Sequence, residues 1–389
     1  MSINIEDKSK CCGCRACEQI CPIEIIHMEE DTEGFIYPQV GDKCIECKLC
    51  EKVCPLLNDN KKLSEEFVPK VYAAHIKDEE ILVNSSSGGI FTALAEAVLR
   101  QQGMVFGAAY NEEMNVEHIC INKIDDLHKL RGSKYVQSNT LATYGQVKQI
   151  LGKERYVLYV GTPCQIAGLK RYLGKVYERL ITVDLVCHGT PSPKIFREYI
   201  QYLNSKSNKK VKEFNFRYKG EYGWGLRYQL KFNCNKDETN IAALSPYYYA
   251  FLNDMLHRPV CYSCPYATEQ REGDITLADY WGIEQEHPKA FNEKGNSLII
   301  VNSTKGAELL GKIESKLEIV ESSMDVAKKK NGNLSKPSNK HSYRDIIYID
   351  LEKHGFKYIS KKYCRPRKYL RLKISNMIPS TIKKYLKKL

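Results

Sequence analysis

The first 58 residues carry a cysteine motif that occurs twice at the same spacing. In each copy, two residues separate successive members of a cysteine triplet, three more residues precede a fourth cysteine, and a proline comes directly after it. The first copy comprises Cys11, Cys14, Cys17 and Cys21, and the second comprises Cys44, Cys47, Cys50 and Cys54. Three thiolates at this spacing can hold one face of a cubane cluster. The segment is therefore predicted to fold around metal.

This doubled spacing is typical of bacterial two-cluster ferredoxins, in which the fourth cysteine of each copy binds the other cluster. We therefore predict a ferredoxin-like domain over residues 1–58 with two [4Fe–4S] clusters. The expected ligands are Cys11, Cys14, Cys17 and Cys54 for the first cluster, and Cys44, Cys47, Cys50 and Cys21 for the second. A pair of structural zinc sites is the alternative, but zinc does not require this spacing or the Cys-Pro ending. Cys12 lies outside the register and is expected to be a spare thiol.

Composition supports metal ligation and excludes other classes. Hydrophobic residues make up 43% of the chain and charged residues 27%, which is the balance of a globular protein rather than a disordered one. The N-terminus has neither the basic start nor the apolar core of a secretory signal, and no stretch is apolar enough to span a membrane. We therefore expect a cytoplasmic protein, in which the sixteen cysteines stay reduced and are free to bind metal.

A polar run, NDNKKLSEE (58–66), separates the cysteine-rich segment from the body of the chain. Residues 67–325 are predicted to form a mixed-sheet α/β domain. A helix over 85–103 joins two strands in a β-α-β unit, and residues 211–234 alternate like an antiparallel pair. The expected strands of the sheet are 71–76, 104–110, 155–161, 180–187, 274–282 and 296–303.

Four further cysteines occur in the body at positions that suit a ligand site. Cys164 and Cys187 each follow a buried-type strand, and Cys261 and Cys264 form a C-x-x-C pair. Ligands usually bind where the carboxyl ends of neighbouring strands meet in an α/β sheet. The surrounding phrases are GTPCQ, CHGTPSP and GDITLADYWG, the last of which follows the C-x-x-C pair.

Together these phrases resemble the coenzyme F420 hydrogenase/dehydrogenase beta subunits, a family whose relatives include plant hydroxymethyl-chlorophyll reductase. The resemblance extends over most of residues 1–300. It implies a flavoprotein that binds FAD and iron–sulfur clusters and moves electrons between a two-electron carrier and one-electron centres.

The resemblance also places the flavin on SSSGG (85–89) and RGSKYVQS (131–138). Two glycines followed by a helix N-terminus suit a diphosphate, although an ordinary capped helix and a solvated basic loop are the alternatives. The implied flavin contacts are Ser86, Ser87, Gly88, Gly89, Arg131, Gly132, Ser133, Lys134, Tyr135, Gln137 and Thr162.

Two candidate residues carry chemistry. His188, next to Cys187, could pass a proton to the flavin or substrate, with a helix-capping or core histidine as the alternative. Lys134, with Arg131, could neutralise phosphate or a reduced flavin anion.

We further expect Cys164, Cys187, Cys261 and Cys264 to bind a third [4Fe–4S] cluster beside the flavin. A zinc site could use the same thiolates, and a redox-active thiol pair at Cys261 and Cys264 would leave the other two unexplained.

The C-terminal extension, residues 326–389, holds 19 Lys and Arg against 3 Asp and Glu. Within it, residues 361–389 contain no acidic residue and are loosely amphipathic, so an anionic membrane surface or an acidic partner is expected, with a solvated tail as the alternative. Nucleic acid is not expected, because no nucleic-acid motif accompanies the basic run.

The predicted function is that of an iron–sulfur flavoprotein oxidoreductase that exchanges electrons with reduced coenzyme F420 or another hydride carrier. The first alternative is an electron-transfer subunit without its own substrate, which docks to a catalytic partner. The second is a scaffold in which the clusters are only structural.

Overall fold

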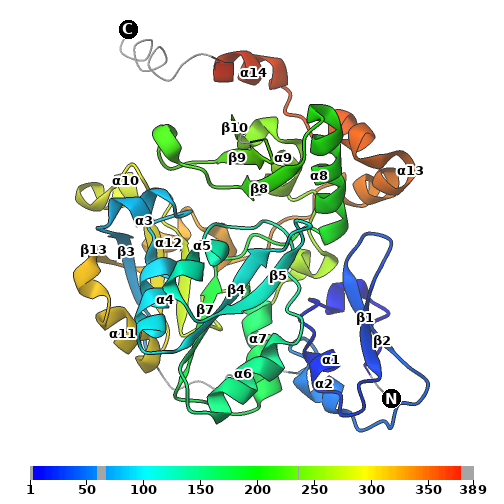
Figure 1. The fold of residues 1–389 in the computed structure, drawn as a ribbon, viewed down its shortest axis with the longest axis vertical. Helices are drawn as coiled ribbons and strands as arrows, with labels where there is room; N and C mark the ends of the chain where they lie inside the picture. Colours follow the sequence, from blue (N-terminus) through cyan, green and yellow to red (C-terminus); the bar gives the residue numbers. More distant parts are fainter. Residues whose placement is uncertain (1–2, 59–66, 235, 378–389) are drawn as a thin grey trace.

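The computed structural model describes residues 3–58, 67–234 and 236–377 (Figure 1). The N-terminal segment forms a small head of two short helices and one hairpin, in the order α1 (Ala16–Gln19), β1 (Ile26–Glu30), β2 (Ile36–Val40) and α2 (Leu49–Val53). Each helix carries one cysteine of its motif and begins after a residue in the left-handed conformation, Arg15 before α1 and Lys48 before α2. The two motifs thus repeat in backbone conformation as well as in sequence.

The body is built on one eight-stranded sheet in the order β13-β3-β12-β11-β7-β6-β4-β5. Its centre, β11-β7-β6-β4, is parallel, and antiparallel strands flank it on both sides. The strands are β3 (Lys70–Ile76), β4 (Met104–Tyr110), β5 (Val116–Ile121), β6 (Val157–Gly161), β7 (Leu180–Leu185), β11 (Ile275–Asp279), β12 (Ser297–Val301) and β13 (Leu317–Ser322).

Helices cover both faces of the sheet, because alternate residues of its central strands are apolar on opposite sides. On β4, Val105 packs with the α4 side and Phe106 with the α7 side. The first layer comprises α3 (Glu79–Val83), α4 (Ile90–Arg100), α5 (Leu127–Leu130) and α11 (Thr304–Gly311). The opposite layer comprises α6 (Thr143–Gly152) and α7 (Pro163–Leu173) and, over β3 and β12, α10 (Ile283–Glu286) and α12 (Met324–Lys328).

A second, smaller sheet with its own helices lies next to the body, at the top of Figure 1. It is an antiparallel sheet in the order β10-β9-β8, and its core is aromatic, including Phe196, Tyr199, Phe214 and Tyr247. Its elements are α8 (Pro193–Ser207), β8 (Val211–Asn215), β9 (Arg227–Phe232), β10 (Asp237–Ile241), α9 (Pro246–Leu252), α13 (Arg344–Lys362) and α14 (Tyr369–Met377).

The mixed α/β architecture predicted from the sequence is confirmed, and each strand expected in the sheet is present within a few residues. The β-α-β unit differs from expectation. Its strands β3 and β4 are parallel but four other strands lie between them, so α4 makes a long crossover. This is possible because β12 and β11, from much later in the chain, pair in the space beside β3.

The first part of the C-terminal extension is folded. Helix α13 buries Ile347, Leu351 and Ile359 in the aromatic core, so this part of the extension packs as part of the folded protein. Residues 378–389, which carry the end of the predicted amphipathic tail, lie outside the described residues.

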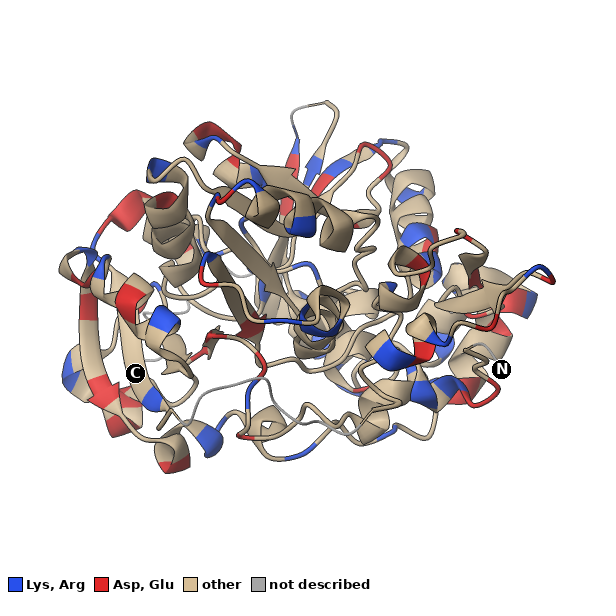
Figure 2. Cartoon of the chain, turned by 90° about the horizontal axis from the view of Figure 1, so that it is seen from below, with Lys and Arg blue, Asp and Glu red and all other residues tan. Residues whose placement is uncertain are grey.

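Within the described chain, no helix combines the length and apolarity that crossing a bilayer would require. Basic and acidic residues are interspersed along the periphery of the chain in Figure 2.

The head packs directly on α7, and a glycine makes this contact possible. A Cβ atom at Gly168 would lie 2.9 Å from Sγ of Cys14 and 3.2 Å from Oη of Tyr144. Cys14 is buried in the same cluster as Ile166 and Leu169 of α7. The absence of a side chain at Gly168 therefore sets how closely the first cysteine motif approaches the body.

We expect Gly168→Ala to weaken this contact. Alanine normally stabilises an exposed helix by about 0.5–1 kcal/mol relative to glycine. At Gly168 the added methyl group overpacks the contact with Cys14, and a net loss of about 1–3 kcal/mol is expected. Gly145→Ala on α6 is the matched control, because its Cβ atom would meet only Oη of Tyr172, at 3.6 Å. Thermal unfolding of both variants checks this, and equal midpoints would contradict it.

Candidate functional site

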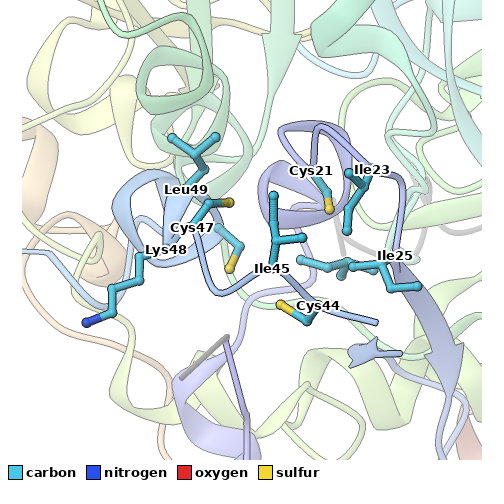
Figure 3. A pocket seen from close by; sticks show the side chains of 10 residues that line it. Cys21, Ile23, Ile25, Cys44, Ile45, Cys47, Lys48 and Leu49 are labelled. Atoms are coloured by element: carbon cyan, nitrogen blue, oxygen red, sulfur yellow. The ribbon is translucent and has the colours of Figure 1, made fainter. Parts of the chain in front are cut away.

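The cysteines of the head form two groups that each combine both motifs. Cys21 of the first motif lies with Cys44, Cys47 and Cys50 of the second around one small pocket. Figure 3 shows the sulfurs of Cys21, Cys44 and Cys47 on its walls, with Ile23, Ile25 and Ile45 between them. This is the grouping expected for the crossed second cluster.

The second group surrounds Cys17. Burial raises the pKa of its thiol, and the neighbouring Cys11 and Cys54 raise it further. A hydrogen bond with Cys12 would lower the pKa of Cys14, but burial and nearby Cys17 and Cys54 raise it. Burial also raises the pKa of Cys54. Buried neighbouring thiols of this kind suit metal ligation, because a bound metal compensates the thiolate charges.

A cavity of about 520 Å³ opens at the carboxyl ends of β6, β7 and β11. Its lining residues include all four body cysteines, Cys164, Cys187, Cys261 and Cys264. The strand topology explains their convergence. Cys164 lies in the first turn of α7 directly after β6, and Cys187 follows β7, the parallel neighbour of β6.

The four body cysteines are electrostatic neighbours. Burial raises the pKa of Cys187 most strongly, and Cys261, Cys164 and Cys264 raise it further. Four soft thiolates of this kind suit an iron–sulfur cluster and equally a tetrahedral zinc ion.

Cys12 has a position that the sequence did not indicate. The sequence suggested a spare thiol, but its side chain is buried and lies within hydrogen-bonding distance of both Cys14 and Cys164. Cys12 therefore lies where the head meets the cavity, between the first head group and the body cysteines.

The two segments expected to hold a flavin meet on the cavity wall. The Oγ atom of Ser86 accepts hydrogen bonds from the backbone N–H of Ser133, at 2.8 Å, and from its hydroxyl, at 3.0 Å. Gly89, with φ +83°, caps the N-terminus of α4, which also faces the cavity. Of the predicted flavin contacts, Ser86, Ser87, Gly89, Arg131, Gly132, Ser133, Lys134, Tyr135, Gln137 and Thr162 line the cavity, whereas Gly88 is not part of the lining and packs against Ser297.

Two of these polar residues are already engaged within the chain. Burial lowers the pKa of Lys134 to about 7, and its ammonium group donates to the carbonyls of Lys129 and Arg131. The amide of Gln137 donates to the carbonyl of Cys12 and accepts from Arg258. Gln137 therefore joins the cavity wall to the head.

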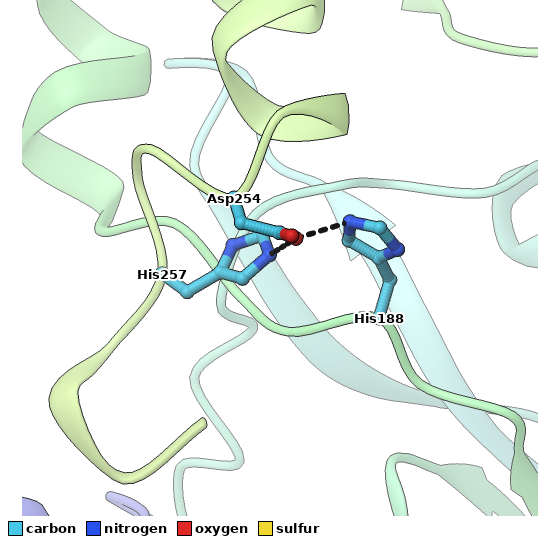
Figure 4. A group of neighbouring side chains, drawn as sticks. All are labelled: His188, Asp254 and His257. Atoms are coloured by element: carbon cyan, nitrogen blue, oxygen red, sulfur yellow. Dashed lines mark hydrogen bonds and ion pairs between the residues drawn. The ribbon is translucent and has the colours of Figure 1, made fainter. Parts of the chain in front are cut away.

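His188 lines the same cavity and forms a side-chain triad with Asp254 and His257 (Figure 4). Its Nε2 atom lies 2.8 Å from Oδ1 of Asp254, and Nε2 of the buried His257 lies 3.1 Å from the same oxygen. Burial lowers the pKa of His257 to about 4. Burial would raise the pKa of Asp254, but its contacts with His188 and His257 lower it below the usual range.

At neutral pH this triad therefore holds a carboxylate against a neutral His257. Such a carboxylate can orient the His188 ring. The three ligand atoms also lie within 4.8 Å of one another, which is close enough for them to share a metal ion.

An ion pair forms another wall of the cavity. The Arg217 guanidinium binds the Asp279 carboxylate in a bidentate manner and lies 5.2 Å from the centre of the Trp281 ring. Arg217 also donates to the hydroxyl of Tyr135.

Sequence reasoning missed Asp254, His257, Arg217 and Arg258. Only Arg258 offered a local signal, since it stands three residues before Cys261. The fold brings Arg217 to the cavity and Asp254 and His257 to His188, and none of the three occupies a recognisable spacing.

Comparison with known proteins places the chain in a family. Residues 71–144 match the N-terminal model, and residues 154–326 the C-terminal model, of the coenzyme F420 hydrogenase/dehydrogenase beta subunit. The chain belongs to this family. Residues 10–58 match the 4Fe-4S dicluster domain, which confirms the prediction of an iron–sulfur head.

One curated relative of this family member is a component of the F(420)H(2) dehydrogenase of Methanosarcina mazei, 24% identical over 192 residues. The match covers 46% of this chain and 53% of the relative, so the chain spans about half the length of the curated relative that it matches. A chain in a xenon-derivatised structure of the F420-reducing [NiFe] hydrogenase complex from Methanosarcina barkeri is 18% identical, with a TM-score of 0.46. That alignment covers 70% of this chain and 91% of the other.

The grouping of Cys21 with the second motif generates a test. We expect Cys21→Ser to disturb the cluster built on Cys44, Cys47 and Cys50 and to spare the cluster built on Cys11, Cys14 and Cys17. Iron content and paramagnetic spectra after anaerobic purification distinguish the two. Cys54→Ser is the matched control and should have the opposite effect. Loss of the Cys11 cluster in Cys21→Ser would refute the crossed ligation.

Proposed function

We propose that this family member is an iron–sulfur flavoprotein oxidoreductase. In this proposal, FAD occupies the 520 Å³ cavity, a third [4Fe–4S] cluster binds Cys164, Cys187, Cys261 and Cys264, and the head carries the two further clusters. The two-electron partner is reduced coenzyme F420 or another hydride carrier. Bound flavin would supply the exchange between a two-electron carrier and the one-electron clusters.

The observation that carries the proposal is that the two segments expected to hold the flavin and the four body cysteines line one cavity. Ser86 and Ser133 belong to one wall, Cys164 and Cys261 to the other, and Cys12 connects the second wall to the head. A flavin bound there would adjoin the body cysteines. An electron leaving that site would then reach the first head cluster by way of Cys164, Cys12 and Cys14.

The chain's own residues have separate tasks in this proposal. The N-terminus of α4 and Arg131 would bind the diphosphate, since free backbone N–H groups and positive charge favour an anion. His188, held by Asp254, would give or take the proton that accompanies hydride chemistry. The buried Arg217–Asp279 pair would shape the wall next to the reacting ring system.

The second head site would exchange electrons with a redox partner protein. Cys47 is exposed, and Ile45, at 60% exposure, and Ile23, at 42%, leave apolar side chains on the surface around it. An exposed apolar rim around a cluster suits docking of a one-electron carrier. The same surface would serve the alternative function, an electron-transfer subunit without its own substrate.

Loss of one body cysteine tests the proposal. We expect Cys264→Ala to lower iron from about twelve to about eight atoms per chain, because the two head clusters remain. Flavin should stay reducible by the two-electron donor but should no longer pass electrons to the head. Iron analysis and anaerobic donor titrations with optical and paramagnetic detection measure both.

Cys234→Ala is the matched control, because Cys234 is exposed and does not line the cavity. It should keep full iron and full coupling. If Cys264→Ala keeps the iron content and the electron transfer of the native protein, the third cluster is ruled out. Stoichiometric zinc in the native protein would show that the four body cysteines bind zinc instead of a cluster.

We also propose that the basic C-terminal segment contacts an anionic membrane surface. On α14, Leu370 and Ile374 are one helical turn apart and are 74% and 65% exposed. Basic residues surround them in the sequence, and each is worth about 1 kcal/mol near an anionic bilayer.

The double variant Leu370→Asn, Ile374→Asn should weaken binding to anionic vesicles at low salt and leave flavin reduction unchanged. A truncation that begins at residue 361 would be a poorer test, because Tyr363 and Cys364 are buried. Val176→Asn, at another exposed apolar position, is the control in a vesicle sedimentation assay. If the native protein does not bind anionic vesicles at low salt, the membrane contact is excluded.

A further inference from the structure

Arg258 is buried at the contact between the head and the body, with 1% of its surface exposed. Its Nε atom donates to the carbonyl of Cys11 at 2.6 Å, and Nη2 donates to the carbonyl of Ile36 at 2.7 Å. The third hydrogen bond is donated by Nη1 to the amide oxygen of Gln137, at 3.1 Å. The guanidinium also lies 4.2 Å from the centre of the Tyr37 ring.

All three hydrogen-bond acceptors of Arg258 are neutral, which distinguishes it from other buried arginines. Arg217 pairs with Asp279, Arg271 with Asp184 and Arg344 with Glu33. Among the described residues no carboxylate forms an ion pair with Arg258. A buried charge without an opposite charge is costly, so the native protein must supply a negative group at this position.

The ionisable groups next to Arg258 are cysteines of two different sites and one tyrosine. Burial disfavours its charged form, yet the negative forms of Cys11, Tyr37, Cys12 and Cys261 raise its pKa above the usual value. Cys11 belongs to the first head group and Cys261 to the body group. The backbone N–H of Cys261 donates to the carbonyl of Arg258 at 2.9 Å, and both residues line the cavity, so Arg258 stands between the two sites.

We propose that the Arg258 guanidinium is the shared counter-charge of the first head cluster and the third cluster and sets the reduction potentials of both. A cubane held by four thiolates carries net negative charge, which grows when the cluster accepts an electron. A fixed positive charge in contact with it stabilises the reduced state and raises the potential. The role at Cys261 rests on the proposed third cluster, whereas the role at Cys11 needs only the ferredoxin-type head.

A shared charge has a functional consequence. It shifts both potentials in the same direction, so the difference between them, which sets the free energy of electron transfer from one cluster to the other, changes little. The second head group, Cys21 with Cys44, Cys47 and Cys50, has no such contact and should be insensitive to Arg258.

The test is a potentiometric titration of the intact protein followed by paramagnetic resonance. Cluster signals are assigned with Cys264→Ala and Cys21→Ser. Arg258→Gln should lower the midpoint potentials of the Cys11 and Cys261 clusters and leave that of the Cys21 cluster in place. Arg258→Lys keeps the charge and should stay close to the native potentials.

Arg344→Gln is the matched control. Arg344 is equally buried and also joins the body to the head, through Glu33, but its charge is already paired. Loosening the contact in this way should leave all three potentials unchanged.

Native potentials in an iron-replete Arg258→Gln protein would overturn the proposal, as would an equal shift of all three clusters or the same shift in Arg344→Gln. If Arg258→Gln fails to assemble, the potentials of Arg258→Lys test the proposal instead. Lowered potentials in Arg258→Lys would overturn it, because they would show that the hydrogen-bond geometry of Arg258, and not its charge, sets the potentials. A native iron content of about eight would remove the third cluster alone. The shift at the Cys11 cluster would then still test Arg258.

Discussion

The contact between the first cysteine loop and the body is the constraint on which the rest of the structure depends. Three carbonyls of this loop accept hydrogen bonds from the body: that of Cys11 from Arg258, that of Cys12 from Gln137 and that of Cys14 from Thr140. Because the carbonyls face the body, the loop is fixed at the mouth of the cavity. The head therefore approaches the cavity with one of its two cysteine groups and leaves the other towards solvent.

Much of this arrangement could be predicted because it follows from local spacing. The doubled motif in the head requires no tertiary information, and its family match bears out the iron–sulfur prediction. The cysteines after β6 and β7 converge because parallel neighbours end at the same edge of the sheet. Both the glycine-containing loop before α4 and the 131–138 loop line the same cavity, as their resemblance implied.

What could not be predicted depends on partners that are distant in the sequence. Asp254 reaches His188, and Arg258 reaches the cavity, only through the packing of the second sheet and the head. The charge of the C-terminal extension obscured the apolar side of α13, although Ile347 and Leu351 are at helical spacing. In the same way, Cys12 lies outside the register of the cysteine motif and was therefore expected to be a spare thiol. Its neighbours Cys14 and Cys164 come together only when the head packs on the body.

In the proposed function, electron transfer and proton transfer would use different sides of the cavity. Hydride chemistry there would require that electrons and protons leave separately, since iron–sulfur clusters accept only electrons. The cysteines and Arg258 occupy the side that faces the head. His188 lies against Asp254, and their side chains are 37% and 25% exposed, so a proton released at His188 would pass directly to solvent. Burial lowers the pKa of His257 to about 4, so this histidine is neutral near neutral pH. It therefore holds Asp254 in place without competing for that proton.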